Sequence, residues 1–180
     1  DVLVTTIGDI PNGRVIPLGR LREPADAAAR AQVLVVSDAN AGAASAEAWT
    51  LGISQSCGAL RTLGRPVAVF DAPADLPEDC TVLAVAGIAH PDRFVAALND
   101  AGWRVAGQMA FRDHHRYTPA DADAIAAKAA SCGADVVFTT CKDAVRLAAL
   151  GPTPFGLFEV PLTVSFDPPD ALFATVKAAL

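Results

Sequence analysis

Short apolar runs recur along the whole chain, and several of them contain no polar residue at all. A run such as 33–36 is typical of a strand whose two faces are both buried. The last run contains Pro161, which predicts an edge strand or a break at that residue. On this pattern the sequence predicts strands at 2–6, 33–36, 66–70, 81–86, 103–109, 136–138 and 157–166.

Amphipathic segments between these runs predict helices. Pro91 occupies the first position of one such segment, which carries an apolar stripe and ends at Gly102. Residues 118–121, Thr-Pro-Ala-Asp, have the spacing of a capping box and predict a second helix, which Gly133 closes. Residues 140–143, Thr-Cys-Lys-Asp, repeat this spacing and predict a third, shorter helix.

Two further segments are less regular. Asp167–Pro168 is expected to cap a terminal helix. The alanine-rich segment 43–63 could also hold a helix, although its glycines and serines weaken that prediction.

The alternation of strands and helices with short connections predicts an α/β fold, a mostly parallel sheet with helices on both faces. Asn12–Gly13, followed by Val15–Ile16, is a strong tight-turn signal. It adds an N-terminal β-hairpin or ribbon segment to the predicted fold.

A proline-containing segment at 74–78 is the expected flexible junction of the chain. It divides the chain into an N-terminal part, 1–75, and a C-terminal α/β lobe, 76–180. In folds of this class, ligands bind beyond the carboxyl ends of the strands, near helix N-termini. The loops that follow the predicted strands are therefore the expected places for binding residues.

The composition narrows the functional classes. Of the 180 residues, 52% are hydrophobic, so the chain is able to bury a core and is not intrinsically disordered. A net charge of −6 argues against a nucleic-acid partner, which needs a basic surface. No run of about 18 apolar residues occurs, so no membrane-spanning helix is predicted. Four separated cysteines and three histidines do not predict a metal site, and we expect reduced, mostly buried thiols.

The common phosphate-loop and hydrolase motifs do not occur in the 180 residues: there is no Gly-x-x-x-x-Gly-Lys-Ser/Thr, Gly-x-Gly-x-x-Gly or Gly-x-Ser-x-Gly. Two segments are nevertheless locally basic, one with Arg14, Arg20 and Arg22 and the other at 112–116. Guanidinium groups match phosphate oxygens bidentately, so both segments suit an anionic ligand. The alternative is a pair of solvated loops with ordinary surface ion pairs.

Asp113, His114 and His115 lie between a predicted strand and the capping box at 118–121, on a loop at a carboxyl edge. An Asp next to a His can orient it, and a His in this position can act as a general base. Adjacent loop residues often point apart, so only one His need face the site. The alternative is a helix-entry loop with exposed histidines, and no third ligand for a metal is evident.

Two strand-to-helix turns could hold an anion on their backbone N–H groups, one at 87–91 and one at 139–143. Lys142 lies in the first turn of its helix, where a cation opposes the helix dipole and calls for an anion nearby. That anion is either Asp143 or a bound nucleotide or phosphate.

Several of these motifs stand in one recognisable order, which runs through nearly the whole chain. The series resembles the tetraacyldisaccharide 4′-kinase family, the lipid A 4′-kinases. It comprises Asn12-Gly13-Arg14, Pro17-x-Gly-x-Leu21-Arg22-Glu23-Pro24, Val85-Ala86-Gly87-Ile88-x-x-Pro91-x-Arg93-Phe94, Phe111-x-Asp113-His114-His115-x-Tyr117-Thr118 and Thr139-Thr140-x-Lys142-Asp143-Ala144-Val145-x-Leu147.

The resemblance implies an activity and an architecture. The family transfers the γ-phosphate of ATP to the 4′-hydroxyl of a tetraacyl disaccharide 1-phosphate, the lipid A precursor, with Mg²⁺. It works peripherally at the cytoplasmic face of the inner membrane. Its fold joins a P-loop kinase core to a second α/β lobe through a β-ribbon, so residues 1–75 are interpreted as the remainder of that core with its ribbon.

In the family, the phosphate-binding loop precedes the region of resemblance, which implies that this chain is the C-terminal part of such a kinase. We therefore expect the isolated chain to be inactive and to bind neither ATP nor Mg²⁺ tightly. The implied partners are the lipid A disaccharide precursor, the inner-membrane surface and the missing N-terminal kinase core. The alternative is a non-catalytic, kinase-derived module that binds an anionic glycolipid or a partner protein.

The resemblance also implies residue roles. His114, with Asp113 beside it, takes the place of the family's histidine that is thought to pair with an Asp of the N-terminal core. Arg22 and Glu23 are expected near the substrate and its phosphate. The substrate- and phosphate-binding set is completed by Asn12, Arg20 and Lys142. At position 141 the family's usual glutamate is replaced by a cysteine, so a carboxylate of the family's motif is lost at the start of that helix.

Overall fold

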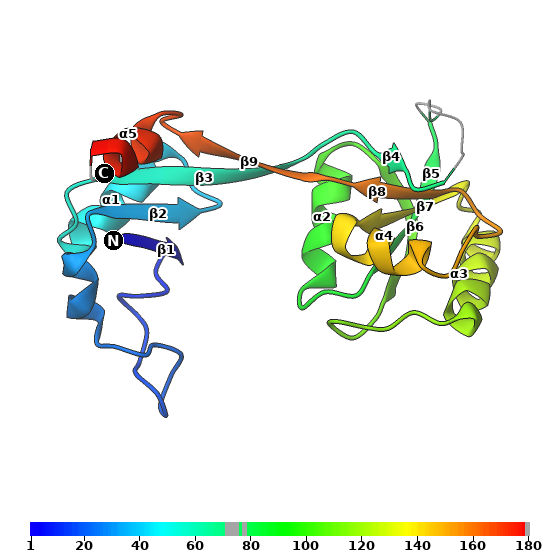
Figure 1. Ribbon diagram of the computed structural model, residues 1–180, viewed down its shortest axis with the longest axis horizontal. Coiled ribbons are helices and arrows are strands. Elements are labelled where there is room, and N and C mark those ends of the chain that lie inside the picture. Colours follow the sequence, from blue (N-terminus) through cyan, green and yellow to red (C-terminus); the bar gives the residue numbers. More distant parts are fainter. Residues whose placement is uncertain (71–75, 77–78, 179–180) are drawn as a thin grey trace. The chain divides into compact units, whose positions relative to one another are not determined.

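The chain forms two units, which are shown in the computed structural model of Figure 1. The structure describes residues 1–70, 76 and 79–178. Unit 1 comprises Asp1–Thr62 and Val164–Leu180, and unit 2 comprises Leu63–Thr163. Unit 2 is therefore inserted into the sequence of unit 1.

Unit 1 is built on a four-stranded sheet with the order β1-β2-β3-β9, in which β1 and β3 both run parallel to β2. Its strands are β1 (Val2–Thr6), β2 (Val33–Ser37), β3 (Ser56–Leu63) and β9 (Leu162–Asp167). Its helices are the 3₁₀ helix η1 (Ala25–Arg30), α1 (Ala41–Leu51) and α5 (Ala171–Ala178).

Strand β2 is the centre of the unit 1 core, because its first four residues are all buried. Leu34 and Val36 pack with Ala44 and Ala48 of α1 on one face of the sheet. Val35 packs on the other face, with Cys57 of β3 and with residues of β9 and α5. Burial of both faces is what the uninterrupted apolar run predicted.

The start of α1 is fixed by two side chains. Asn40 accepts a hydrogen bond from the backbone N–H of Ala43, and the Asp167 carboxylate accepts one from that of Ala41 at 2.7 Å. The prediction that Asp167 caps the terminal helix is therefore wrong, since α5 begins four residues later, at Ala171. Asp167 instead caps a helix that lies 126 residues earlier in the sequence.

The N-terminal strand β1 is confirmed, but Asn12–Gly13 does not join two hairpin strands. The N–H of Asn12 donates to the carbonyl of Gly8, and that of Gly13 donates to the carbonyl of Ile10, so residues 8–13 wind into a helical type of turn. Gly8 has φ of +77°, which glycine adopts without strain and which starts this turn. The paired strands that lead out of unit 1 and back into it are β3 and β9 (Figure 1).

Unit 2 is a five-stranded sheet with the order β4-β8-β7-β5-β6, parallel except for β4. Its strands are β4 (Val67–Ala68), β5 (Thr81–Ala86), β6 (Arg104–Ala110), β7 (Val136–Thr140) and β8 (Leu157–Val160). Its helices are α2 (Pro91–Asp100), α3 (Pro119–Cys132) and α4 (Cys141–Ala148).

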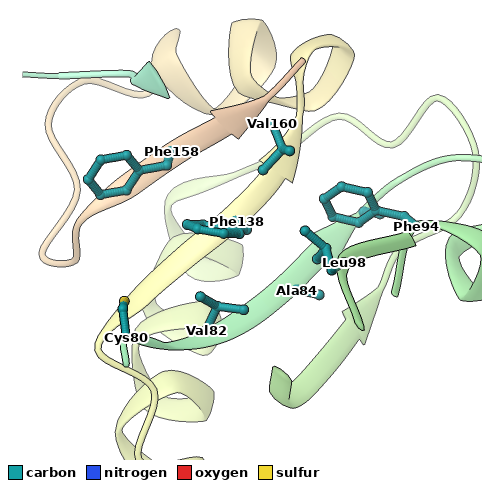
Figure 2. Packing of buried hydrophobic residues seen from close by; sticks show 9 residues of the cluster. Cys80, Val82, Ala84, Phe94, Leu98, Phe138, Phe158 and Val160 are labelled. Carbon is teal, nitrogen blue, oxygen red and sulfur yellow. The ribbon is translucent and has the colours of Figure 1, made fainter. Parts of the chain in front are cut away.

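Each face of the unit 2 sheet carries its own core. Figure 2 shows one of them, in which Val82, Phe138 and Phe158 of three neighbouring strands lie with Phe94 and Leu98 of α2. The opposite core combines the other residues of β5 and β7 with side chains from the remaining helices: Leu83, Val85, Val137, Ile125, Ala129 and Leu147. Helices on both faces of a mostly parallel sheet confirm the predicted α/β class.

The boundaries between elements and between the two units follow the predicted positions only in part. The break at Pro161 is confirmed, since it separates β8 of unit 2 from β9 of unit 1. The expected junction at 74–78 lies outside the described residues apart from Leu76, and the two compact units divide at 62/63 and 163/164. The segment 43–63 holds a strand as well as a helix, because α1 ends at Gly52 with φ of +71° and β3 follows.

Candidate functional site

The candidate residues fall into two groups, one in each unit. Asp113, His114 and Lys142 lie just beyond the carboxyl ends of β6 and β7 in unit 2. The residues of the other group lie between β1 and η1 in unit 1: Asn12, Arg20, Arg22 and Glu23.

Asp143 organises the strand ends of unit 2. Its side chain is completely buried, and its Oδ2 accepts hydrogen bonds from the Thr140 hydroxyl and the Gly87 backbone N–H, both at 2.8 Å. Thr140 caps α4 in return by accepting from the Asp143 N–H at 3.2 Å. A Cβ at Gly87 would lie 3.1 Å from both Asp143 Oδ1 and the Tyr117 hydroxyl, so this close approach favours glycine. Asp143 thus ties the end of β5 to the start of α4.

Lys142 and Asp113 form an ion pair next to this capping arrangement. Lys142 Nζ donates to Asp113 Oδ1 at 2.7 Å, and the backbone N–H of His114 donates to the same oxygen at 2.9 Å. The hydrogen bond from Lys142 is the main cause that holds the pKa of Asp113 below its ordinary value of 3.8. The cation at the start of α4 is therefore compensated from the neighbouring loop.

His114 is held in an uncommon backbone conformation, with φ of 61°. Its Nε2 lies 3.7 Å from Asp113 Oδ2, and its Nδ1 lies 3.3 Å from an Arg146 guanidinium nitrogen. Arginine can only donate, so Nδ1 is the acceptor, and a neutral His114 carries its proton on Nε2, on the side of Asp113. Non-glycine residues in this region of φ cluster at functional sites.

Arg146 connects His114 with the buried carboxylate, since its Nη1 lies 3.5 Å from Asp143 Oδ1. The Tyr117 hydroxyl is buried at the same place and has no hydrogen-bond partner among the described residues. Burial, together with the charge of Asp143, raises the pKa of Tyr117 well above its ordinary value. One turn of α4 therefore supplies three charged groups, at positions 142, 143 and 146, to a single cluster.

His115 points to a different place. Its Nε2 lies 3.1 Å from Asp121 Oδ2, and its ring stacks on Phe111 with centroids 4.7 Å apart. Asp121 also closes the predicted capping box of α3 with Thr118, which is confirmed. Of the two adjacent histidines, only His114 contacts the Asp113 cluster, as expected for neighbouring loop residues.

In unit 1, the segment that follows β1 is anchored by a buried carboxylate. Glu47 of α1 is 8% exposed and accepts a hydrogen bond from the Gly8 N–H at 3.0 Å. The Asn12 side chain donates to the Gly8 carbonyl at 3.0 Å, so it stabilises the turn. Asn12 thus has a structural role, and its role in substrate binding stays a prediction.

The four candidates of unit 1 line two cavities. Asn12 and Arg20, with Arg14, line a cavity of about 640 Å³. Arg22 and Glu23 line another of about 300 Å³, where Glu23 is ion-paired with Arg30. The three exposed arginines at 14, 20 and 22 have no ion-pair partner within the described part of the chain. The geometry suits the binding of anions on guanidinium groups.

Sequence reasoning missed Arg146, Glu47 and Arg30. Arg146 stands four residues after Lys142, so helical spacing alone would have placed both on one face of α4. No local signal marks Glu47, because its partner Gly8 is 39 residues away. Among the described residues, no group of three or more His, Cys, Asp or Glu side chains could hold a metal ion.

Comparisons with known proteins agree on one family. A family model described as LpxK, tetraacyldisaccharide-1-P 4′-kinase, matches residues 2–180. The chain is 39% identical over 163 residues to the tetraacyldisaccharide 4′-kinase of Rhodospirillum centenum, a match that covers 89% of the chain and 45% of that protein. The kinase of Azorhizobium caulinodans is 36% identical over 177 residues, covering 94% of the chain and 49% of the relative. The chain thus spans about half the length of the curated relatives it matches.

A solved structure shares the fold. The "apo" form of LpxK from Aquifex aeolicus, in complex with ATP, matches with a TM-score of 0.64 and 21% sequence identity. The match covers 98% of this chain and 51% of that one. Within the described residues, no helix is both long and apolar enough to cross a membrane.

Proposed function

Since the chain belongs to the tetraacyldisaccharide-1-P 4′-kinase family, we propose that it contributes to the transfer of the γ-phosphate of ATP to the 4′-hydroxyl of a tetraacyl disaccharide 1-phosphate. This transfer is a step in lipid A biosynthesis. The observation that carries the proposal is the cluster of Asp113, His114, Lys142 and Arg146 beyond the strand ends of unit 2. Phosphoryl transfer needs positioned groups and charge neutralisation more than covalent chemistry, and this cluster supplies both.

In this proposal, His114 acts as a general base and accepts a proton at Nδ1. This atom now accepts a hydrogen bond from Arg146, and Nε2 faces the Asp113 carboxylate. To take the proton of a substrate hydroxyl, Nδ1 must first release Arg146. The released guanidinium is then free to contact phosphate oxygens, so one movement would expose the base and present a cation. Asp113, held by Lys142, orients the ring throughout.

The arginines of unit 1 are proposed to bind the anionic disaccharide. Arg20 lines the larger cavity with Asn12, and Arg22 lines the smaller one. Glu23 is assigned a positioning role, because its ion pair with Arg30 keeps its carboxylate from repelling a phosphate at Arg22.

The described residues do not fit a site for Mg²⁺ or for the phosphates of ATP. Mg²⁺ binds through carboxylate oxygens, but Oδ1 of Asp113 already accepts from Lys142, and both oxygens of Asp143 are buried against groups of the protein. The 180 residues also contain no Gly-rich phosphate loop. We therefore assign this chain no step that passes through the metal, and we propose that both groups are held elsewhere, by an N-terminal kinase core like that of the family.

The same proposal extends to location and to the isolated chain. From the proposed lipid substrate we infer that the protein works peripherally at the cytoplasmic face of the inner membrane, and we expect no nucleic-acid partner. Without a phosphate loop, the isolated 180 residues are expected to show no 4′-kinase turnover. Turnover by the isolated chain at the rate of a complete homologue would contradict this part.

The decisive experiment is His114→Ala in the full-length protein, assayed for phosphorylation of the tetraacyl disaccharide with labelled ATP. We expect kcat to fall by ~10²–10⁴-fold, the usual contribution of a positioned proton acceptor. His90→Ala is the matched control and should retain kcat, because His90 is an exposed unit 2 histidine whose side chain caps nothing. Unchanged kcat in His114→Ala would overturn the proposed role of the cluster.

A second candidate is a non-catalytic module that binds an anionic glycolipid. The observation that favours it is the arginine-lined cavity of unit 1 in a chain without a phosphate loop. It predicts that the full-length protein binds the disaccharide but shows no kinase turnover, whereas the first candidate predicts both.

A further inference from the structure

A closed loop projects from unit 1 between Arg14 and Leu21. The Leu21 N–H donates to the Arg14 carbonyl at 3.0 Å, and the Ile16 N–H donates to the Leu21 carbonyl at 2.8 Å. A further bond, from the Leu18 N–H to the Val15 carbonyl at 3.0 Å, folds the tip. At Gly19 the backbone passes so close that a Cβ would lie 2.2 Å from the Arg14 carbonyl oxygen. The loop, here called the 14–21 loop, is therefore internally hydrogen-bonded and tightly folded.

The tip of the 14–21 loop is apolar and turned to solvent. Leu18 is 78% exposed and Ile16 is 58% exposed, with Val15 at 37% beside them. Single exposed apolar residues are common on proteins and need no explanation. Here three of them lie within four positions of one small loop, and its fold does nothing to bury them.

The charge within residues 10–22 is entirely positive. Arg14 and Arg20 flank it and Arg22 follows, while residues 10–22 contain no Asp or Glu in a chain whose net charge is −6. All three arginines are exposed, and none has an ion-pair partner among the residues that the structure describes. The loop thus combines an apolar tip with three exposed arginines close to it in the sequence.

We propose that the 14–21 loop docks on the surface of an anionic phospholipid bilayer, with Ile16 and Leu18 inserted among the lipids and the arginines on the headgroup phosphates. Apolar side chains that enter the headgroup–acyl boundary, together with cations on anionic lipids, are the two contributions that hold a peripheral protein on a membrane. The inference deepens the proposed function, since it gives a lipid-directed enzyme a specific contact with the membrane that contains its substrate.

The pattern favours a bilayer over the other anionic partners. A nucleic acid would be bound by the arginines and repelled by the remaining acidic surface, and it would gain nothing from the aliphatic tip. A soluble phosphate would need only the arginines and the 640 Å³ cavity. Leu18 lines that cavity with the two arginines, but Ile16 does not. Lipid insertion accounts for the exposed side chain of Ile16, whereas binding of a headgroup in the cavity alone does not.

The test is binding of the 180-residue chain to vesicles, measured by sedimentation without ATP or substrate. Vesicles of phosphatidylcholine alone are compared with vesicles that also contain phosphatidylglycerol. We expect binding to the anionic vesicles and at least ~10-fold weaker binding to the neutral ones. Equal binding to both kinds of vesicle, or no binding to the anionic ones, would overturn the proposal.

Matched variants locate the contact. Ile16→Ser with Leu18→Ser should weaken binding to the anionic vesicles at least ~10-fold, since two apolar side chains no longer enter the boundary region. Arg14→Gln with Arg20→Gln should weaken it roughly fivefold for each arginine. Full binding in either double variant, with unchanged thermal unfolding, would contradict the assigned loop.

Controls elsewhere on the chain separate a specific contact from general stickiness. Trp49→Ser removes a side chain of α1 that is 88% exposed, and Arg65→Gln with Arg104→Gln removes two exposed cations of unit 2. Both should bind vesicles as the unaltered chain does, and a loss equal to that of the loop variants would overturn the proposal. His114→Ala should bind normally too, so failure of the kinase proposal and failure of this inference are separate results.

Discussion

The two charged regions of the molecule differ in how their charged side chains are paired. In unit 2, Lys142 is paired with Asp113, and Arg146 lies between Asp143 and His114. In unit 1, the arginines at 14, 20 and 22 are exposed and have no ion-pair partner within the described residues. The charged groups of the unit 2 cluster are therefore paired with one another, although the buried Tyr117 hydroxyl, Asp143 Oδ1 and Arg146 Nη1 have no hydrogen-bond partner among the described residues, whereas the unit 1 arginines have no ion-pair partner there.

This difference indicates what each region is built to do. Paired charges around a buried carboxylate hold side chains in fixed positions, which suits the orientation of a reacting group. Arginines without an ion-pair partner can bind phosphate without first breaking an internal ion pair. We therefore expect removal of a charge in unit 2 to disturb the fold, and removal of the unit 1 arginines to disturb only binding.

The largest effect on stability is expected for Asp143→Ala. The change removes the acceptor of two hydrogen bonds, of which the one from Gly87 is buried, and it leaves Arg146 and the Gly87 N–H without their partner. Loss of one member of a buried charged network costs about 3–5 kcal/mol. Urea unfolding of unit 2, followed by near-UV signals from Trp103, which packs against its core, should report this loss.

Asp123→Ala is the control for Asp143→Ala, because Asp123 is an exposed residue of α3. Its cost should stay within about 0.5 kcal/mol, as for ordinary surface substitutions. Equal stability of the two variants would mean that the unit 2 cluster is as loosely held as the unit 1 arginines, and the comparison would fail.

A smaller effect is expected for Glu47→Ala, which tests the exception within unit 1. Glu47 is a buried carboxylate whose bond to the Gly8 N–H anchors the turn that carries Asn12. Loss of this acceptor should cost about 1–3 kcal/mol, the usual penalty for an unsatisfied buried donor. Hydrogen exchange should accelerate most at Gly8 and Asn12, and Glu47→Gln, which keeps an acceptor oxygen, should largely restore the protection. An unchanged exchange rate at Gly8 would show that the turn at residues 8–13 is stable without its contact to α1.

Local signals carried most of the fold prediction. The capping spacings at 118–121 and 140–143 placed the starts of α3 and α4, because the bonds of a helix N-terminus join residues three apart. The hairpin at Asn12–Gly13 was wrong for the opposite reason. Its turn is set by Gly8 and by a carboxylate from α1, 39 residues away, and no nearest-neighbour pattern contains that contact.

The candidate site shows the same limit. The sequence placed Asp113 and Lys142 at strand ends of one sheet edge, but the ion pair between them joins residues 29 positions apart. Arg146 could have been added from its helical spacing to Lys142. Asp167 could not have been assigned correctly, since its partner in α1 is 126 residues away and a local cap on α5 was equally compatible with its neighbours.

The smallest effect is expected for Lys142→Met, and it concerns pH. The hydrogen bond from Lys142 is the main cause of the lowered pKa of Asp113, so this pKa should rise toward 3.8 in the variant. A carboxyl whose pKa is lowered by folding stabilises the protein above its unfolded pKa and loses that contribution as the pH falls through the folded value. The stability difference between the unaltered chain and Lys142→Met should therefore be present near neutral pH, begin to decrease below about pH 4, and vanish once the pH is below the lowered pKa of Asp113.

An NMR titration of the Asp113 carboxyl carbon measures the shift directly, and Lys128→Met, which removes an exposed lysine of α3, is its control. In the control variant the titration of Asp113 should stay in place. If Lys142→Met also left the pKa of Asp113 unchanged, the ion pair with Lys142 would not stabilise the loop that carries His114. The charged side chains of unit 2 would then be as independent of one another as the three arginines of unit 1. The two regions would no longer differ in whether their charges are coupled.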